Sequence, residues 1–168
     1  MNQLFFLACA AILLGSVLVT ANNVALNRQE VLISTEATIT GTAIAQELIE
    51  EISVRKFDQY NSAPGQLATD STTFSLIMGP DAGENQDSVS TLNDIDDFNG
   101  FKRTVVTPRT GNFVQSCKVY FIQEGSPDAL FSTQTYLKRI DVTVRNSAII
   151  SPDSCIVVSK IVSYRYKG

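Results

Sequence analysis

The first part of the chain is a long apolar run. From Leu4 to Ala21 no side chain carries a charge, and a run of this length reaches the lower end of what a membrane-spanning helix needs. No proline follows it, and Asn22-Asn23 is only a weak interruption before the next helical segment. The pattern therefore predicts one continuous helix from about Asn2 to Arg55, roughly 80 Å long at about 1.5 Å per residue.

The second part of this helix, residues 23–55, is predicted to be amphipathic. Apolar or small residues recur at spacings of four and seven, which places them on one stripe of a helix. The members of this stripe are Ile33, Ala37, Ile44, Leu48 and Ile52. Another element must cover such a stripe, whereas residues 1–22 suit a membrane or the core of a filament.

Residues 56–100 form a connecting region rich in Pro, Gly, Asn, Asp and Ser. These residue types favour turns, and the short apolar run at 74–78 predicts one strand. Loops of this length are usually functional or lie over the domain that they belong to. We expect this region to cover part of a globular head.

From residue 101 the hydrophobic period changes to two, which is typical of strands. Four strands are predicted, at 101–107, 113–123, 136–145 and 155–166, with turn signals between them. In the third, Ile140, Val142 and Val144 alternate with polar residues, so one face is buried and the other is wet. The prediction is an α+β fold in which the long N-terminal helix packs on a C-terminal four-stranded antiparallel sheet at 101–168. Basic residues of the last two strands are expected on a solvated face; they are Lys138, Arg139, Arg145, Lys160, Arg165 and Lys167.

Composition limits the classes of function. The 168 residues allow one modest core beyond the N-terminal run, and the net charge of −4 argues against nucleic acid as a partner. The chain has no His, so histidine acid–base chemistry and most zinc sites are excluded. Because the sequence also lacks a nucleophile elbow and a phosphate-binding Gly-rich loop, we expect no enzyme.

One of the three cysteines lies in the apolar run, and the other two lie in the predicted head. Cys9 lies in the apolar run, where a thiol behaves as a small hydrophobic side chain. Cys117 and Cys155 both fall in predicted strands of the head, and two cysteines in an exported domain most simply form one disulfide. Two reduced thiols are the alternative.

The N-terminal run has three interpretations. We favour a retained helix, because the run continues into the amphipathic segment without a break. A cleaved signal peptide ending at Val19-Thr20-Ala21 is the main alternative, although no positive charge precedes the run. A lipoprotein signal with Cys9 as the modified residue is the third.

Four segments resemble the minor pilin-like proteins of mannose-sensitive haemagglutinin pilus loci, within the broader class of type IV pilins and pseudopilins. They are the helix end AQELIEEI at 45–52, the turn GPDAGE at 79–84, the segment NDIDDFNGF at 93–101 and the late strand LKRIDVTV at 137–144. The resemblance implies a structural subunit of a type IV pilus-like or type II secretion-like filament. Its partners would be copies of itself or other pilin-like subunits, with the inner membrane as its site before assembly and the cell surface afterwards.

This resemblance also implies roles for particular residues. Assembly would use the apolar helix, through Leu4, Phe5, Phe6, Leu7, Ile12, Leu13, Leu14, Val17 and Leu18. Gly15, Ser16, Gly41 and Ala45 are small residues at which helices can approach closely. The sequence departs from the pilin pattern at its start, because no Gly precedes the apolar run and no Glu occurs before Glu30. Either Met1 is the processed N-terminus or the prepilin peptidase does not process this chain.

One oxygen-rich group could bind a metal ion. Some pseudopilin heads bind calcium in acidic loops, and Asp94, Asp96 and Asp97 offer the oxygen ligands that calcium requires. Further acidic residues of the same group lie upstream, at Asp81, Glu84 and Asp87. The alternative is an acidic turn whose Asp side chains accept hydrogen bonds from their own backbone. No other cofactor is expected.

Two classes of function are therefore open. The first is the structural filament subunit, which acts by packing its helix. The second is a secreted or periplasmic binding module with a cleaved signal peptide, whose segment 58–100 recognises a ligand.

Overall fold

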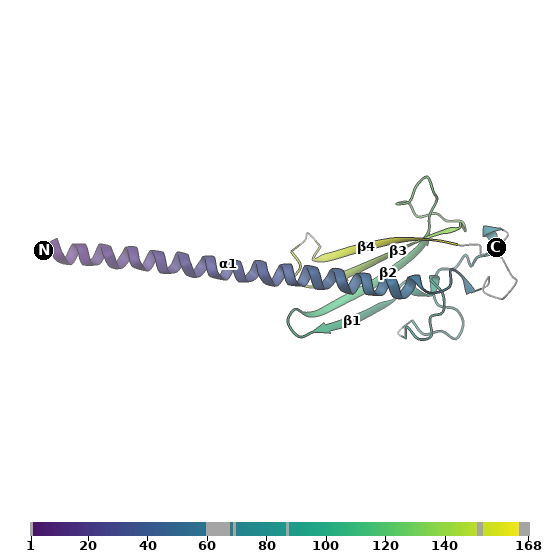
Figure 1. Ribbon diagram of the computed structural model, residues 1–168, viewed down its shortest axis with the longest axis horizontal. Helices are drawn as coiled ribbons and strands as arrows, with labels where there is room; N and C mark the ends of the chain where they lie inside the picture. The colour runs from purple at the N-terminus through teal and green to yellow at the C-terminus, as the bar shows by residue number, and fades with distance from the viewer. Residues whose placement is uncertain (1, 60–67, 69, 87, 151–152, 165–168) are drawn as a thin grey trace.

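The computed structural model describes residues 2–59, 68, 70–86, 88–150 and 153–164. One helix, α1 (Asn2–Ser53), occupies the N-terminal third of the chain. Two 3-10 helices follow, η2 (Ser71–Thr73) and η3 (Asp96–Phe98). The strands are β1 (Lys102–Thr107), β2 (Gly111–Phe121), β3 (Leu137–Arg145) and β4 (Cys155–Ser163). Figure 1 shows α1 extending far beyond the sheet.

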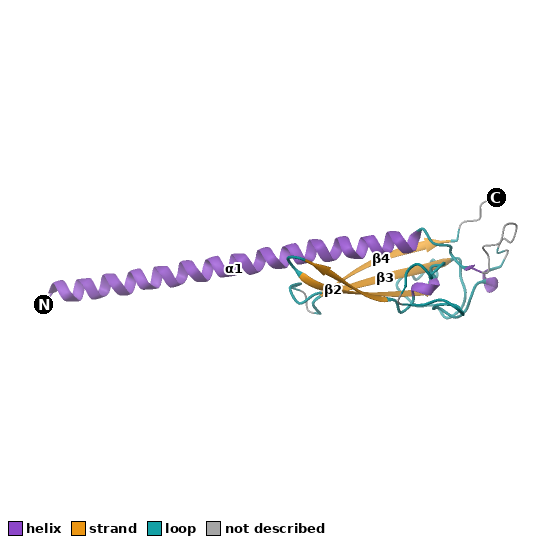
Figure 2. Ribbon diagram, turned by 90° about the horizontal axis from the view of Figure 1, so that it is seen from below, coloured by secondary structure: helices purple, strands orange, loops and turns teal. Residues whose placement is uncertain are grey.

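The four strands form one antiparallel sheet in the order β1-β2-β3-β4. Seen from the side, the sheet and the second half of α1 form two layers (Figure 2). The predicted α+β fold is confirmed, and each strand end lies within two residues of its predicted position except that of β4, which ends at Ser163 instead of 166. The predicted end of the last strand, at residue 166, lies outside the described residues.

The strand predicted at 74–78 is absent from this part of the structure, which consists of bends. Its backbone groups bond to side chains instead of to a neighbouring strand. Ser75 N donates to Asp58 Oδ2 at 2.7 Å, and Gln134 Nε2 donates to Phe74 O at 3.3 Å. Short apolar runs do not by themselves distinguish a strand from a packed loop.

The predicted stripe on α1 forms one side of the main core. Ala37, Ile44, Leu48 and Ile52 are buried against the sheet, in a cluster with Phe113 and the inward residues of β3. Ile33 was assigned wrongly, since it is 43% exposed and the buried position at that turn belongs to Ser34. The difference arises where α1 leaves the end of the sheet.

Polar contacts flank this stripe on both sides. Arg103 of β1 pairs with Glu51 at 3.4 Å, and Lys160 of β4 pairs with Glu50 at 2.9 Å. The two adjacent glutamates thus point to opposite edges of the sheet, as their spacing on a helix requires. Exposed pairs of this kind contribute little to stability, but together they fix how α1 lies across the strands.

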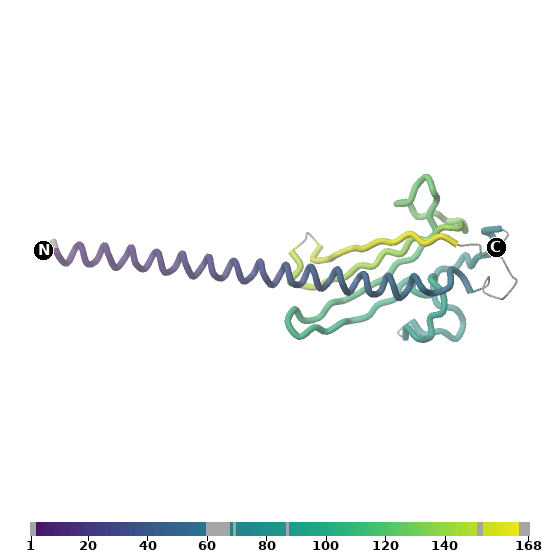
Figure 3. Tube along the Cα trace, viewed as in Figure 1, coloured from purple at the N-terminus to yellow at the C-terminus, as the bar shows by residue number. Residues whose placement is uncertain are grey.

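We call residues 2–33 of α1 the stalk, and the remainder of the described chain the head. The turns β1–β2 and β3–β4 face the stalk, whereas the segment between α1 and β1 and the β2–β3 connection gather at the opposite end of the head (Figure 3). Asn99 ties this far segment to β2, because its Oδ1 accepts from Val119 N at 3.1 Å and its Nδ2 donates to Met78 O at 3.2 Å. The region therefore covers the far end of the sheet.

The predicted disulfide between Cys117 and Cys155 is wrong, because the structure joins neither to the other. Cys117 of β2 lies opposite Val142 of β3, which in turn lies opposite Val158 of β4. Cys155 lies three residues before Val158, at the start of β4, and on the other face of the sheet. Two strand spacings amount to about 10 Å, beyond the roughly 7 Å between Cα atoms that a disulfide tolerates.

Gly41 lies at a point where α1 packs tightly against the sheet. A Cβ atom placed there would lie 2.9 Å from Ile156 Cδ1 and 3.4 Å from Phe113 Cε1. Gly15, on the stalk, has no such neighbour within 4 Å.

We therefore expect Gly41→Leu to lower the free energy of unfolding of the head by about 1 to 3 kcal/mol, because the larger side chain pushes α1 away from β4. Gly15→Leu is the matched control and should leave the free energy of unfolding of the head unchanged. Denaturant unfolding of the full chain in detergent measures both. Equal stability of the two variants would show that the helix does not approach the sheet this closely.

Candidate functional site

The surface of the stalk is the first candidate site. All nine residues predicted for assembly, from Leu4 to Leu18, are between 62% and 76% exposed. By length and composition α1 qualifies as a membrane-crossing helix, a test that signal sequences near an N-terminus also pass. The chain therefore carries a long apolar N-terminal helix suited to a membrane anchor or a signal sequence.

Hydroxyl groups in the stalk have internal hydrogen-bond partners. Ser16 Oγ donates to Leu13 O at 2.8 Å, and Thr20 Oγ1 donates to Ser16 O at 2.8 Å. Back-bonding of this kind satisfies a hydroxyl without water. These polar side chains are thus compatible with an apolar environment such as lipid or neighbouring helices.

The four small residues separate into two pairs. Gly15 and Ser16 are exposed on the stalk and stay available for close approach of another helix. Gly41 and Ala45 are buried against this chain's own sheet. Their small size therefore serves the head rather than contact between subunits.

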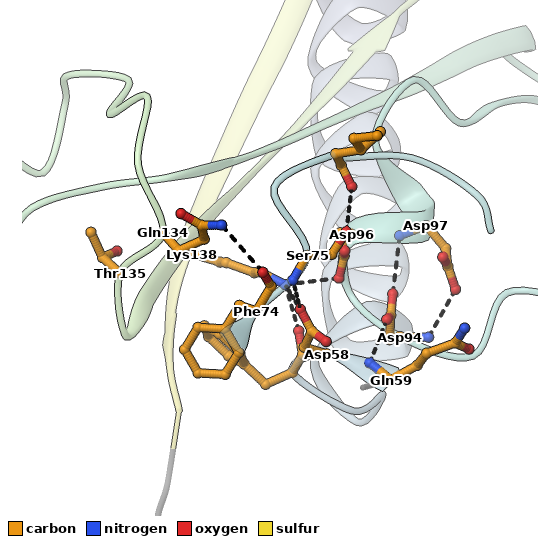
Figure 4. Close-up of polar contacts among 12 residues, drawn as sticks. Asp58, Gln59, Phe74, Ser75, Asp94, Asp96, Asp97, Gln134, Thr135 and Lys138 are labelled. Carbon is orange, nitrogen blue, oxygen red and sulfur yellow. Dashed lines mark hydrogen bonds and ion pairs between the residues drawn. The ribbon is translucent and has the colours of Figure 1, made fainter. Parts of the chain in front are cut away.

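The second candidate site is a buried charged cluster at the far end of the head (Figure 4). It consists of Asp58, Asp94, Asp96, Asp97 and Lys138, and none of them is more than 3% exposed. Lys138 Nζ lies 2.7 Å from Asp96 Oδ1 and 3.9 Å from Asp58 Oδ2. One ammonium group thus faces several dehydrated carboxyl groups.

Lys138 was predicted on a solvated face, and this is wrong. It precedes Ile140 by two residues, so the pleat of β3 directs both side chains to the buried face. Arg139 and Arg145 lie on the other face as expected, while Lys160 turns towards Glu50 of the helix. Arg165 and Lys167 lie outside the described residues.

Asp94 and Asp97 form an acidic turn. Asp94 Oδ2 accepts from Gln59 N at 2.8 Å, and its Oδ1 accepts from Asp97 N at 3.2 Å. Asp97 Oδ2 accepts from the backbone N–H groups of Asn93 and Asp94, at 2.8 and 3.0 Å. These bonds match the alternative in which the carboxylates stabilise their own loop.

The predicted calcium ligands are not all brought together. Asp96 turns away to pair with Lys138, while Asp81 joins Asp94 and Asp97 so that one oxygen of each lies within 4.8 Å of the others. Asp81 was counted with the upstream part of this acidic group but not among the three predicted ligands, because its proximity to them depends on how the loop folds back. Calcium binding at this group stays a prediction.

Burial shifts the ionisation of the cluster. It raises the pKa of Asp94 to about 9, with the neighbouring charge of Asp96 as the next cause. Burial also raises the pKa of Asp96, although Lys138 acts in the opposite direction. Elsewhere in the sheet, burial raises the pKa of the Cys117 thiol to about 12, so this thiol is a poor nucleophile at neutral pH.

No family model, curated protein or solved structure matches this chain. Its function must therefore be inferred from its own residues and geometry.

The first prediction for the cluster concerns its cation. Lys138→Met should destabilise the head by roughly 3 to 5 kcal/mol, because it leaves buried carboxylates without a counter-charge. The double variant Lys138→Met with Asp96→Asn should be more stable than the single variant, since the charge of Asp96 is then removed as well. Thermal and denaturant unfolding measure the stability of the single and the double variant. A single variant as stable as the wild type would contradict the buried ion pair.

The second prediction concerns pH. Because the folded-state pKa of Asp94 lies near 9, well above its ordinary value, the folded state binds a proton that the unfolded state has released. The free energy of unfolding should therefore fall as pH rises between about 4 and 9, by up to about 1.4 kcal/mol per pH unit.

Asp94→Asn imitates the protonated acid and should flatten this decline. Unfolding at about pH 5 and about pH 8 in a buffer with a metal chelator measures the difference. Parallel pH profiles for the wild type and the variant would contradict the raised pKa.

Proposed function

We propose that this protein is a pilin-like structural subunit of a type IV pilus-like or type II secretion-like filament. The observation that carries the proposal is that α1 forms one side of the head's core at one end and an exposed apolar surface at the other. The mechanism is packing rather than catalysis, since the stalk exchanges lipid for the stalks of neighbouring subunits.

The exposed apolar surface continues beyond one membrane thickness. After residue 21, Val31, Leu32 and Ile39 are still 59%, 69% and 66% exposed. A single anchor needs about 20 apolar residues, so these side chains would face water if the helix only crossed a membrane. Exposed apolar surface of this extent marks an interaction site, and neighbouring subunits of a filament would cover it.

Contacts between stalks would depend on shape. Lipid tails are as apolar as Leu, so helices associate in a membrane through close packing at small residues. Gly15 and Ser16 lie on the exposed stalk and would allow such an approach. The partners are therefore further copies of this chain or other pilin-like subunits.

The proposal places the protein in the cell envelope. The stalk would hold it in the inner membrane before assembly, with the head on the outer side of that membrane. After assembly, the stalks would form the filament core and the heads its surface, where they are available for adhesion.

The test separates assembly from anchoring. Leu32→Glu places a charge on the exposed apolar surface just beyond the membrane-length run, and should abolish incorporation into filaments. Membrane association and the stability of the head should be unchanged, because Leu32 lies beyond the membrane-length run and is 69% exposed. Leu32→Met keeps an apolar side chain at the same position and is the matched control. Shearing releases the filaments so that the incorporated protein can be measured. Fractionation of the remaining cells then measures the protein in the membrane.

Leu13→Arg extends the test into the apolar run itself, and should block assembly without unfolding the head. Normal filament yield from both charged variants would overturn the proposal. A wild-type pool that is entirely soluble and lacks residues 1–21 would instead support the secreted binding module.

A further inference from the structure

Lys138 lies in a site closed to solvent, next to two carboxyl groups and two aromatic rings. Its side chain is 0% exposed, and its Nζ donates to Asp96 Oδ1 at 2.7 Å and to Phe57 O at 2.6 Å. The ammonium lies 4.5 Å from the ring centroid of Phe57 and 5.3 Å from that of Phe121. Figure 4 shows Asp96 and Asp58 flanking the end of this lysine.

Stability alone does not explain this arrangement. Replacement of a whole buried ion pair by apolar residues is often neutral or stabilising. An apolar residue at 138 would simply continue the buried row of β3 formed by Ile140 and Val142. The pair instead holds the lysine nitrogen 2.7 Å from a carboxyl oxygen of Asp96 in a site closed to solvent, and such proximity favours a reaction between the two groups.

We propose that Lys138 and Asp96 condense to form an intramolecular isopeptide bond. A proton first passes from Nζ to the carboxylate of Asp96, which gives a neutral amine and a neutral acid. Nζ then attacks Cγ of Asp96, so that an N–C bond forms, one C–O bond breaks and one molecule of water leaves. The condensation needs neither an oxidant nor a reductant.

Asp58 supplies the proton transfer that this step requires. Its Oδ2 lies 3.9 Å from Nζ and is held in place by Ser75 N, which donates to it at 2.7 Å. Asp58 takes a proton from the attacking nitrogen and returns it to the departing oxygen, so it ends the reaction unchanged. Phe57 O then accepts the one N–H that the new amide retains.

The product suits its surroundings better than the reactants do. A buried ion pair is costly in an apolar environment, whereas a hydrogen-bonded amide carries no charge. The bond would join η3 to β3 across 42 residues of sequence. In a filament under tension, it would fasten the segment after α1 covalently to the sheet, in a head whose Cys117 and Cys155 are not joined.

Peptide mass spectrometry of the full chain, purified in detergent and cleaved with trypsin, tests the proposal. Trypsin does not cleave after an acylated lysine, so peptide 57–102 should appear joined to peptide 119–139. The mass of the joined peptide should be lower than the sum of the two by one water, and its fragments should place the link at Asp96 and Lys138. Recovery of separate peptides 57–102 and 119–138 from the folded protein would overturn the proposal.

Two variants of the cluster identify the groups involved. Asp58→Asn keeps both reacting residues but removes the proton acceptor, and should abolish the joined peptide. Asp94→Asn is the matched control, because it changes another buried carboxyl group that is not paired with Lys138, and should retain the joined peptide. A joined peptide of undiminished yield in Asp58→Asn would overturn the role given to Asp58.

Discussion

The contact between the buried stripe of α1 and one face of the sheet is the constraint on which the rest of the structure depends. The sheet has an apolar face that a second layer must cover, and the stripe from Ala37 to Ile52 provides that layer. Gly41 allows the helix to lie close to β4, and the glutamates beside the stripe fix its direction. Because the same helix continues without a break into the stalk, the direction of the stalk is fixed by the core of the head.

This continuity links folding to the proposed assembly. A stalk on a flexible hinge would let each head take many orientations in a filament, and ordering them would cost conformational entropy. In this protein the second half of α1 is part of the core, so subunits that pack by their stalks also align their heads. The buried cluster at the far end has a complementary role, because Lys138 and Asp96 connect the segment after α1 to the sheet.

The hydrophobic period predicted most of the architecture. The change from helical spacing to alternation identified α1 and all four strands, because one-sided burial imposes a period on any element. Lys138 shows the same rule applied incompletely, since its position two residues before Ile140 already assigned it to the buried face. Its charge suggested solvent, but its carboxylate partners come from a distant loop and no local pattern reveals them.

Other parts were not predictable from local pattern. The separation of Cys117 from Cys155 follows from strand order and register, which alternation does not determine. The approach of Asp81 to Asp94 and Asp97, like the bends at 74–78, depends on hydrogen bonds between loop side chains and backbone. Loops have no repeating geometry, so their contacts follow from tertiary packing rather than from sequence spacing.

The most direct test of this account is the N-terminal sequence and intact mass of the protein isolated from membranes and filaments. The account predicts a mature chain that retains the apolar run from Leu4 to Ala21 as the first part of α1. A mature chain that begins at Asn22 in every pool would contradict it, because no stalk would then remain to assemble.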